Sequence, residues 1–128
     1  MKTVVPAWMK PVCDAYAFPA AVIDGEFVRC SGVIGFKPDL SVSSDPAAQF
    51  TLAFENLESV LEEAGAGFAD VVEMNTYHVG LQAHMQAFVA IKNQFMKPPY
   101  PAWTAIGITE LALPGALVEI QVTARRRG

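Results

Sequence analysis

One segment near the end of the chain alternates apolar and polar side chains, and this alternation restricts the fold more than any other feature. In ALVEIQVTA, residues 116–124, the apolar positions are Val118, Ile120, Val122 and Ala124, separated by Glu119, Gln121 and Thr123. Successive side chains of a strand point to opposite faces, so the pattern predicts a strand with one covered face. The chain therefore needs a sheet with a second layer packed on one side.

Two amphipathic segments are predicted to supply that layer. Between Asp45-Pro46 and Gly65, apolar residues recur at helical spacing, with an N-cap residue and a proline at the start and a glycine stop at the end. A second helix is predicted over roughly Leu81 to Met96, and Pro98 and Pro99 end it. Both helices have an apolar stripe that can cover one face of the sheet.

The remaining segments predict the other strands. Asp24-Gly25 lies between two β-prone runs of residues 20–32 and indicates a two-residue hairpin turn. Residues 69–80 and 102–108 are also predicted as strands. This order predicts an α+β fold, a mixed β-sheet with two helices packed on one face, in a single domain over residues 1–128.

The second face of this sheet has an unusual predicted composition. In the segment 102–108 we place Thr104, Ile106 and Ile108 toward the helices, which leaves Trp103, Ala105 and Gly107 beside Glu119 on the other face. That face would have little charge and no lysine. Such a surface is typical of an oligomer interface or a pocket wall.

Charge and cysteine content exclude several classes of protein. The net charge is −4 and the basic run 125–127 is read as a solvated terminal cluster, so we expect no nucleic-acid partner. Two cysteines and two histidines without ligand spacing predict neither a disulfide framework nor a metal site. No apolar run reaches transmembrane length and the N-terminal segment lacks a signal-peptide pattern, so we expect a cytoplasmic protein without membrane contact.

Four stretches together resemble the Rid superfamily, the reactive intermediate deaminases, also called YjgF-like proteins. They are VRCSGVIG (28–35), AFENLESVLEEAGAGFADVVEMNTYHVG (53–80), PAWTAIGI (101–108) and LPGALVEIQVTARR (113–126). The resemblance runs from about Phe18 to the C-terminus. It implies a chorismate-mutase-like fold and a homotrimer, with small-molecule ligands bound in the clefts between subunits. No cofactor is expected.

The resemblance also implies site residues. Glu119 matches a catalytic glutamate that handles the hydrolytic water, and Ser31-Gly32 match a substrate-binding pair. Phe18 stands at an aromatic position without the usual hydroxyl, and backbone groups around Thr104 and Ala105 are expected to contact substrate. Trp103 stands where the deaminases have an arginine that clamps the carboxylate of a 2-imino acid.

The replacement of arginine by Trp103 changes the expected activity. An indole has one N–H donor and no charge, and loss of a charge-assisted contact costs roughly 1.5–3 kcal/mol, or about ten- to a hundredfold. Efficient 2-imino acid deamination is therefore not expected. We expect instead an enzyme that hydrolyses or deaminates an enamine, imine or related metabolite, or alternatively a non-catalytic small-ligand binding or interaction protein on the same trimer.

Several alternatives stay open at this point. Glu119 is either a general base or a structural glutamate at an interface, and Trp103 is either a pocket wall or an interface plug. Arg29, on the strand face of Ser31, is either a substitute cation or an ordinary exposed residue. The ribonuclease role sometimes attached to relatives is disfavoured, because the chain has no basic stripe.

Overall fold

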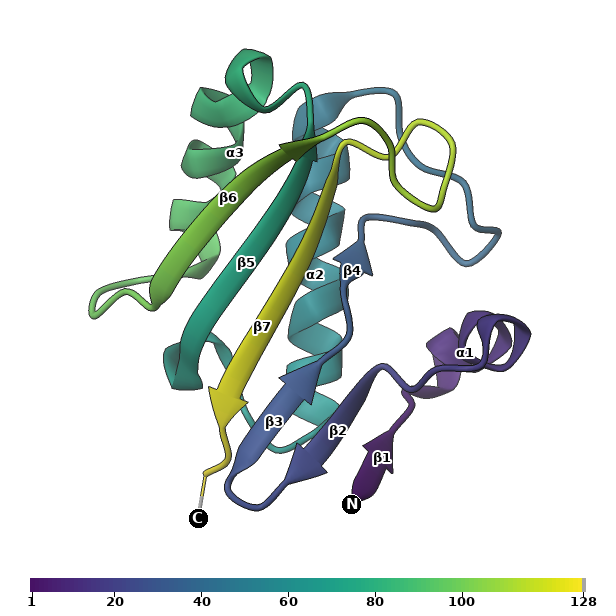
Figure 1. Cartoon of the computed structure of the whole chain (residues 1–128), viewed down its shortest axis with the longest axis vertical. Helices are drawn as coiled ribbons and strands as arrows, with labels where there is room; N and C mark the ends of the chain where they lie inside the picture. The colour runs from purple at the N-terminus through teal and green to yellow at the C-terminus, as the bar shows by residue number, and fades with distance from the viewer. Residues whose placement is uncertain (128) are drawn as a thin grey trace.

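The sheet is built around β7 (Val118–Arg125), which pairs with three other strands. The computed structural model describes residues 1–127 and shows the strand order β1-β2-β3-β7-β5-β6, with the short β4 (Val33–Ile34) also paired to β7 (Figure 1). The other strands are β1 (Lys2–Val4), β2 (Ala21–Asp24), β3 (Phe27–Cys30), β5 (Val71–Val79) and β6 (Ala102–Ile108). The pair β5–β6 is parallel and the remaining pairs are antiparallel, so the sheet is mixed, as predicted.

Helices α2 (Pro46–Glu63) and α3 (Leu81–Phe95) cover one face of this sheet, the far face in Figure 1. The predicted apolar face of β7 lies beneath them, and all four of its residues are buried: Val118, Ile120, Val122 and Ala124. Phe50, Phe54 and Phe88 are fully buried between the helices and the sheet. The predicted α+β arrangement is therefore confirmed.

The predicted ends of α2 are also confirmed. The Asp45 carboxylate accepts a hydrogen bond from the backbone N–H of Ala48 at 3.2 Å, and Pro46 is the first helical residue. Gly65, just beyond the helix, has φ +81°, a conformation that costs little only for glycine. Local capping signals were sufficient to place this helix.

The hairpin between β2 and β3 lies one residue later than predicted. Asp24 pairs with Phe27, so the two loop residues are Gly25 and Glu26. Gly25 has φ +61° and Glu26 does not have a positive φ. A turn with positive φ only at its first central position is type II′, which needs glycine there and accepts glutamate next.

The N-terminal part contains elements that were not predicted from the sequence. A 3-10 turn (Ala7–Met9) leads into α1 (Lys10–Tyr16), and β1 extends the edge of the sheet beside β2. The Trp8 indole N–H donates to the Ser59 hydroxyl at 3.1 Å, which ties this part to α2. Among residues 1–127, no helix has the length and apolar character needed to cross a membrane.

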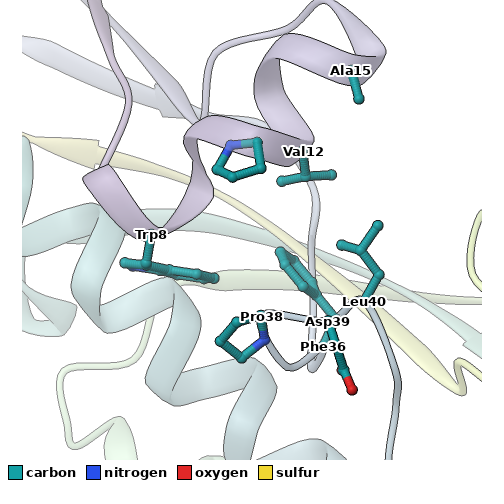
Figure 2. Close-up of a pocket in the computed structure, with 8 residues that line it drawn as sticks. Trp8, Val12, Ala15, Phe36, Pro38, Asp39 and Leu40 are labelled. Carbon is teal, nitrogen blue, oxygen red and sulfur yellow. The ribbon is translucent and has the colours of Figure 1, made fainter.

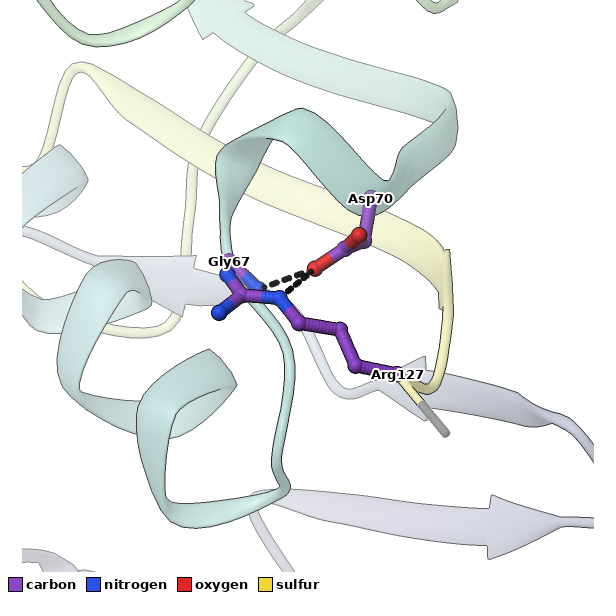
Figure 3. Close-up of polar contacts among 3 residues, drawn as sticks. All are labelled: Gly67, Asp70 and Arg127. Carbon is purple, nitrogen blue, oxygen red and sulfur yellow. Dashed lines mark hydrogen bonds and ion pairs between the residues drawn. The ribbon is translucent and has the colours of Figure 1, made fainter.

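The basic C-terminal run makes local ion pairs rather than remaining fully solvated. Arg127 Nε donates to Asp70 Oδ2 at 2.7 Å, and the backbone N–H of Gly67 donates to the same oxygen at 2.8 Å (Figure 3). The hydrogen bond from Arg127 lowers the pKa of Asp70. Arg125 lies 3.8 Å from Glu26. Exposed pairs of this kind contribute at most about 1 kcal/mol each.

Gly35, after β4, is predicted to be intolerant of any side chain. A β-carbon there would overlap the backbone carbonyl oxygen of Gln49 and lie 2.9 Å from the backbone nitrogen of Ala53, both in α2. Gly35→Ala should lower the free energy of unfolding in urea by about 1–3 kcal/mol. Gly107→Ala is the control, because its β-carbon would meet nothing closer than Leu81 at 3.6 Å. Equal costs for both variants would contradict the packing described.

Candidate functional site

Glu119 lies near the start of β7, on the face of the sheet that α2 and α3 leave open. Its neighbours across the strands are Ile34 in β4 and Tyr77 in β5. The side chain is partly buried, and among residues 1–127 its carboxylate accepts no hydrogen bond and has no cationic nitrogen within 4.0 Å. Burial raises the pKa of the Glu119 carboxyl above its usual value. The group is therefore poised to exchange a proton closer to neutral pH.

A hollow of about 290 Å³ lies beside this carboxylate. Phe18, Ser31 and Gly32 line it together with Glu119, so four of the predicted site residues meet there. The rest of the wall is mainly apolar and comprises Met9, Val12, Tyr16, Ile34, Phe36, Ala112 and Leu113. A small ligand in this space would contact apolar side chains and one carboxylate.

Gly32 allows Glu119 to lie directly against the backbone. A β-carbon at Gly32 would lie 2.5 Å from Cδ of Glu119, well inside van der Waals contact. The glycine of the Ser31-Gly32 pair therefore has a steric role, since any other residue would displace the carboxylate.

Ser31 makes hydrogen bonds to the backbone, and its neighbour Cys30 is buried. The Ser31 hydroxyl donates to the backbone carbonyl of Pro19 at 2.8 Å, and the Ser31 N–H donates to that of Ala20 at 2.9 Å. Ser31 thus satisfies backbone groups at the end of the hairpin. Cys30 is buried, and burial raises the pKa of its thiol to about 12, so little thiolate forms near neutral pH.

A second apolar hollow, of about 220 Å³, adjoins the first and shares Val12 and Phe36 with it. Figure 2 shows α1 on one side and the loop after β4 on the other, with Trp8 and Leu40 on the wall. Sequence reasoning missed this part of the site because it did not predict α1. The sequence does contain a signal for this helix, because Trp8 and Val12 are four residues apart and Pro11 lies in its first turn.

The prediction that Trp103 shares a face with Glu119 is wrong. The parallel register places Trp103 beside Met74, and Met74 lies beside Val122 of the helix-covered face. Residues paired across neighbouring strands point to the same side. Trp103, Ala105 and Gly107 therefore face the helices, while Thr104 and Ile106 are on the open face. Trp103 does not line the Glu119 hollow of its own chain.

Trp103 is held on the helix side by a specific hydrogen bond. Its indole N–H donates to the Thr76 hydroxyl at 2.9 Å, and that oxygen also lies 2.7 Å from Nε2 of His78. The ring centroid is 6.0 Å from that of Phe88. Burial lowers the pKa of His78, which favours the neutral imidazole beside Thr76. The indole is thus fixed in orientation and only partly exposed.

The other candidate residues are placed as follows. Arg29 shares the open face with Ser31, but its Nε donates to Asp24 at 3.0 Å and it does not line the hollow. Thr104 and Ala105 lie in β6, beyond β5 from Glu119. Within residues 1–127, no three histidine, cysteine, aspartate or glutamate side chains are placed to hold a metal ion.

Comparison with known proteins agrees with this fold. The family model described as Endoribonuclease L-PSP matches residues 11–126. The chain belongs to this family, to which the YjgF-like and Rid proteins also belong. It is 35% identical over 123 residues to the RutC family protein YjgH of Escherichia coli K12, covering 95% of this chain and 92% of the relative.

Two further comparisons extend the family assignment. The chain is 30% identical over 106 residues to a 2-iminobutanoate/2-iminopropanoate deaminase of Dermatophagoides farinae, covering 81% of both chains. A solved structure of protein YjgH superposes with a TM-score of 0.91 at 34% identity, covering 99% of this chain and 97% of that one. The resemblance in sequence is therefore matched in the fold.

The raised pKa of Glu119 predicts a pH-dependent gain in stability from its removal. The folded chain binds this proton more tightly than the unfolded chain, so stability falls as pH rises from the unfolded pKa through the folded one. The change in unfolding free energy caused by Glu119→Gln should therefore be more stabilising at pH 7 than below about pH 4. Urea unfolding across this range measures the difference. Glu73→Gln, at an exposed position of β5, corrects for the change in net charge.

Loss of the Thr76 hydroxyl is predicted to destabilise the fold through Trp103. Thr76→Val keeps the shape of a fully buried residue but removes the acceptor of the indole N–H. The expected cost is about 1–3 kcal/mol in chemical unfolding followed by circular dichroism. Thr104→Val, on the open face of the same region, should change stability by less than about 0.5 kcal/mol. A larger loss of stability for Thr104→Val than for Thr76→Val would mean that the indole faces the other way.

Proposed function

We propose that this protein is a hydrolase that converts a small imine or enamine into the corresponding carbonyl compound and ammonia. The observation that supports it most is the unpartnered, partly buried Glu119 on the wall of a mainly apolar hollow. A carboxylate without a partner in such surroundings lowers the stability of the fold, and such groups concentrate at functional sites. The similarity to a 2-iminobutanoate/2-iminopropanoate deaminase supports the same class of reaction.

In the proposed reaction, Glu119 acts as a general base and then as a general acid. The substrate reacts as its iminium ion, protonated on nitrogen by solvent, and the Glu119 carboxylate takes a proton from water as the water oxygen bonds to the iminium carbon. The protonated Glu119 then protonates the amine of the tetrahedral intermediate. The carbon–nitrogen bond breaks and ammonia leaves as the Glu119 carboxylate takes the hydroxyl proton and the carbonyl forms. Glu119 then passes this proton to solvent. The raised pKa of Glu119 suits both transfers, since the group is then neither too weak a base nor too weak an acid.

We infer that the protein forms a homotrimer and that a neighbouring subunit completes the site. Each subunit is then a single domain formed by the whole chain. The open face of the sheet bears the exposed Ile106 and a tyrosine–glutamine pair, Tyr77 and Gln121. Such a face suits contact with a second copy. In this assembly, the β6 edge of one copy, with Trp103, Thr104 and Ala105, would close the Glu119 hollow of the next.

Trp103, in place of the arginine of the related deaminases, limits the proposed range of substrates. Because an indole replaces the arginine of the related deaminases, 2-iminopropanoate should be a poorer substrate than apolar imines or enamines of similar size. The apolar wall of Phe18, Val12 and Leu113 favours the same preference. In the alternative function, ligand binding without catalysis, the hollow would be occupied but no substrate would turn over.

The proposal is tested by following imine hydrolysis directly. Imines formed in situ from alanine, 2-aminobutyrate and larger apolar amino acids should lose ammonia faster with the protein than in buffer. Glu119→Gln should reduce the rate about a hundredfold or more, because general base catalysis typically contributes that much. Glu55→Gln, at an exposed position of α2, is the matched control and should leave the rate unchanged. Equal rates for Glu119→Gln and the parent protein would reject the proposed mechanism, and saturable binding without turnover would favour the non-catalytic alternative.

A further inference from the structure

The hollow between α1 and the loop after β4, which we call the α1 hollow, borders the Glu119 hollow. Val12 and Phe36 line both spaces, so one ligand of sufficient length would reach from Glu119 into the α1 hollow. The volume of the α1 hollow is about 220 Å³. An engineered apolar cavity of about 150 Å³ binds benzene. The α1 hollow therefore has room for a group of the size of a phenyl ring.

The wall of the α1 hollow is apolar. Asp39 is the one charged residue among those described that line it, and the others are tryptophan, proline, valine, alanine, phenylalanine and leucine. Oδ1 of Asp39 accepts hydrogen bonds from the hydroxyl and the backbone N–H of Ser41, at 2.6 and 3.0 Å. This carboxylate is thus bonded within its own loop. The hollow favours a hydrocarbon group over a polar or charged one.

Trp8 is held on the wall of the α1 hollow in a fixed orientation. Its indole N–H donates to the Ser59 hydroxyl at 3.1 Å, and its ring centroid lies 5.6 Å from that of Phe36. The side chain is only partly buried. Because the protein itself uses the one polar group of the indole, Trp8 offers a ligand an apolar ring.

Leu40 lines the hollow from a backbone conformation that is unfavourable for leucine. Its φ is +69°, in the left-handed region that bulky residues avoid. The turn is closed by the backbone N–H of Leu40, which donates to the carbonyl of Lys37 at 2.7 Å. Glycine would adopt this turn at lower cost, so the turn alone does not require leucine. Such strain concentrates at ligand-binding sites, and here it places an apolar side chain on the wall of the hollow.

We propose that the α1 hollow binds the hydrocarbon body of the substrate, a phenyl ring or an alkyl group of similar size, while the reacting carbon lies beside Glu119. This inference rests on the hydrolase activity proposed above and narrows its substrates to imines and enamines with such a group a few bonds from the reacting carbon. Trp8, Val12 and Leu40 then determine specificity. Burial of a phenyl ring in the hollow should raise affinity about tenfold or more.

Benzylacetone and acetone test the hollow without turnover, because they are the ketones that hydrolysis of the corresponding imines would release. Both have a methyl ketone carbon, and only benzylacetone has a phenyl ring on a short spacer. The indole N–H signal of Trp8 is followed by NMR in the full chain. Benzylacetone should shift this signal in a saturable manner, whereas acetone is too small to reach Trp8 from the Glu119 hollow. No shift with benzylacetone, or equal shifts with both ketones, would overturn the proposal.

Two alanine variants separate binding in the hollow from a general effect of added bulk. Ala15 of α1 and Ala87 of α3 are both exposed, but only Ala15 lines the α1 hollow. Ala15→Phe should fill part of the space and weaken benzylacetone binding about tenfold, while Ala87→Phe should change it less than twofold. Leu40→Gly, which removes part of the wall, should weaken binding about threefold or more. Equal effects of the two alanine variants, or unchanged binding in Leu40→Gly, would contradict the proposal.

Rates of imine hydrolysis distinguish failure of this site from failure of the hydrolase activity. The imines of both ketones are formed in situ by oxidation of the matching primary amines. In the parent protein, kcat/KM should be at least about tenfold higher for the imine of benzylacetone than for that of acetone, and Ala15→Phe should reduce this ratio about tenfold. If neither imine is hydrolysed while benzylacetone still shifts the Trp8 signal, the hydrolase activity is rejected and the binding site stands. If both are hydrolysed in a ratio that Ala15→Phe leaves unchanged, the hydrolase activity stands and this site is rejected.

Discussion

The pairing of β7 with its neighbours determines the position of every candidate site residue. Its apolar residues face α2 and α3, and this fixes which face Glu119 occupies. The register continues through β5 to β6, so Val122, Met74 and Trp103 form one row on the helix side. A slip of one residue would exchange the two faces along the whole strand. The burial of one row of β7 therefore positions both Glu119 and Trp103.

Local signals in the sequence were enough for the elements that have them. The alternation of β7, the Asp45 cap and the left-handed Gly65 depend on neighbours along the chain, and all three appear as predicted. The gathering of Phe18, Ser31 and Gly32 around Glu119 was implied by the resemblance and is seen in the hollow. Their roles in catalysis or binding remain proposals.

The errors arise where a local pattern does not determine the answer. In β6, Thr104, Ile106 and Ile108 alternate as a covered face would, but β6 is an edge strand and Ile106 is 45% exposed. Its orientation is set by the parallel pairing with β5 across the α3 connection, which periodicity cannot reveal. Helix α1 has only seven residues, with Pro11 in its first turn, and is too short for a clear periodic stripe. The wall that α1 adds to the site was therefore missed.

Glu119 and Lys92 share one physical property, although they lie on opposite sides of the sheet. Burial raises the pKa of the acid and lowers that of the base, so each charge is less stable in the folded chain than in water. A neutral residue of similar size would remove either cost, and among residues 1–127 no opposite charge lies within 4.0 Å of either group. If the two groups paired directly with each other between copies, attraction would move both pKa values back in the opposite directions. The pKa values of Glu119 and Lys92 in the assembled protein therefore distinguish an ion pair between subunits from two groups that do not meet.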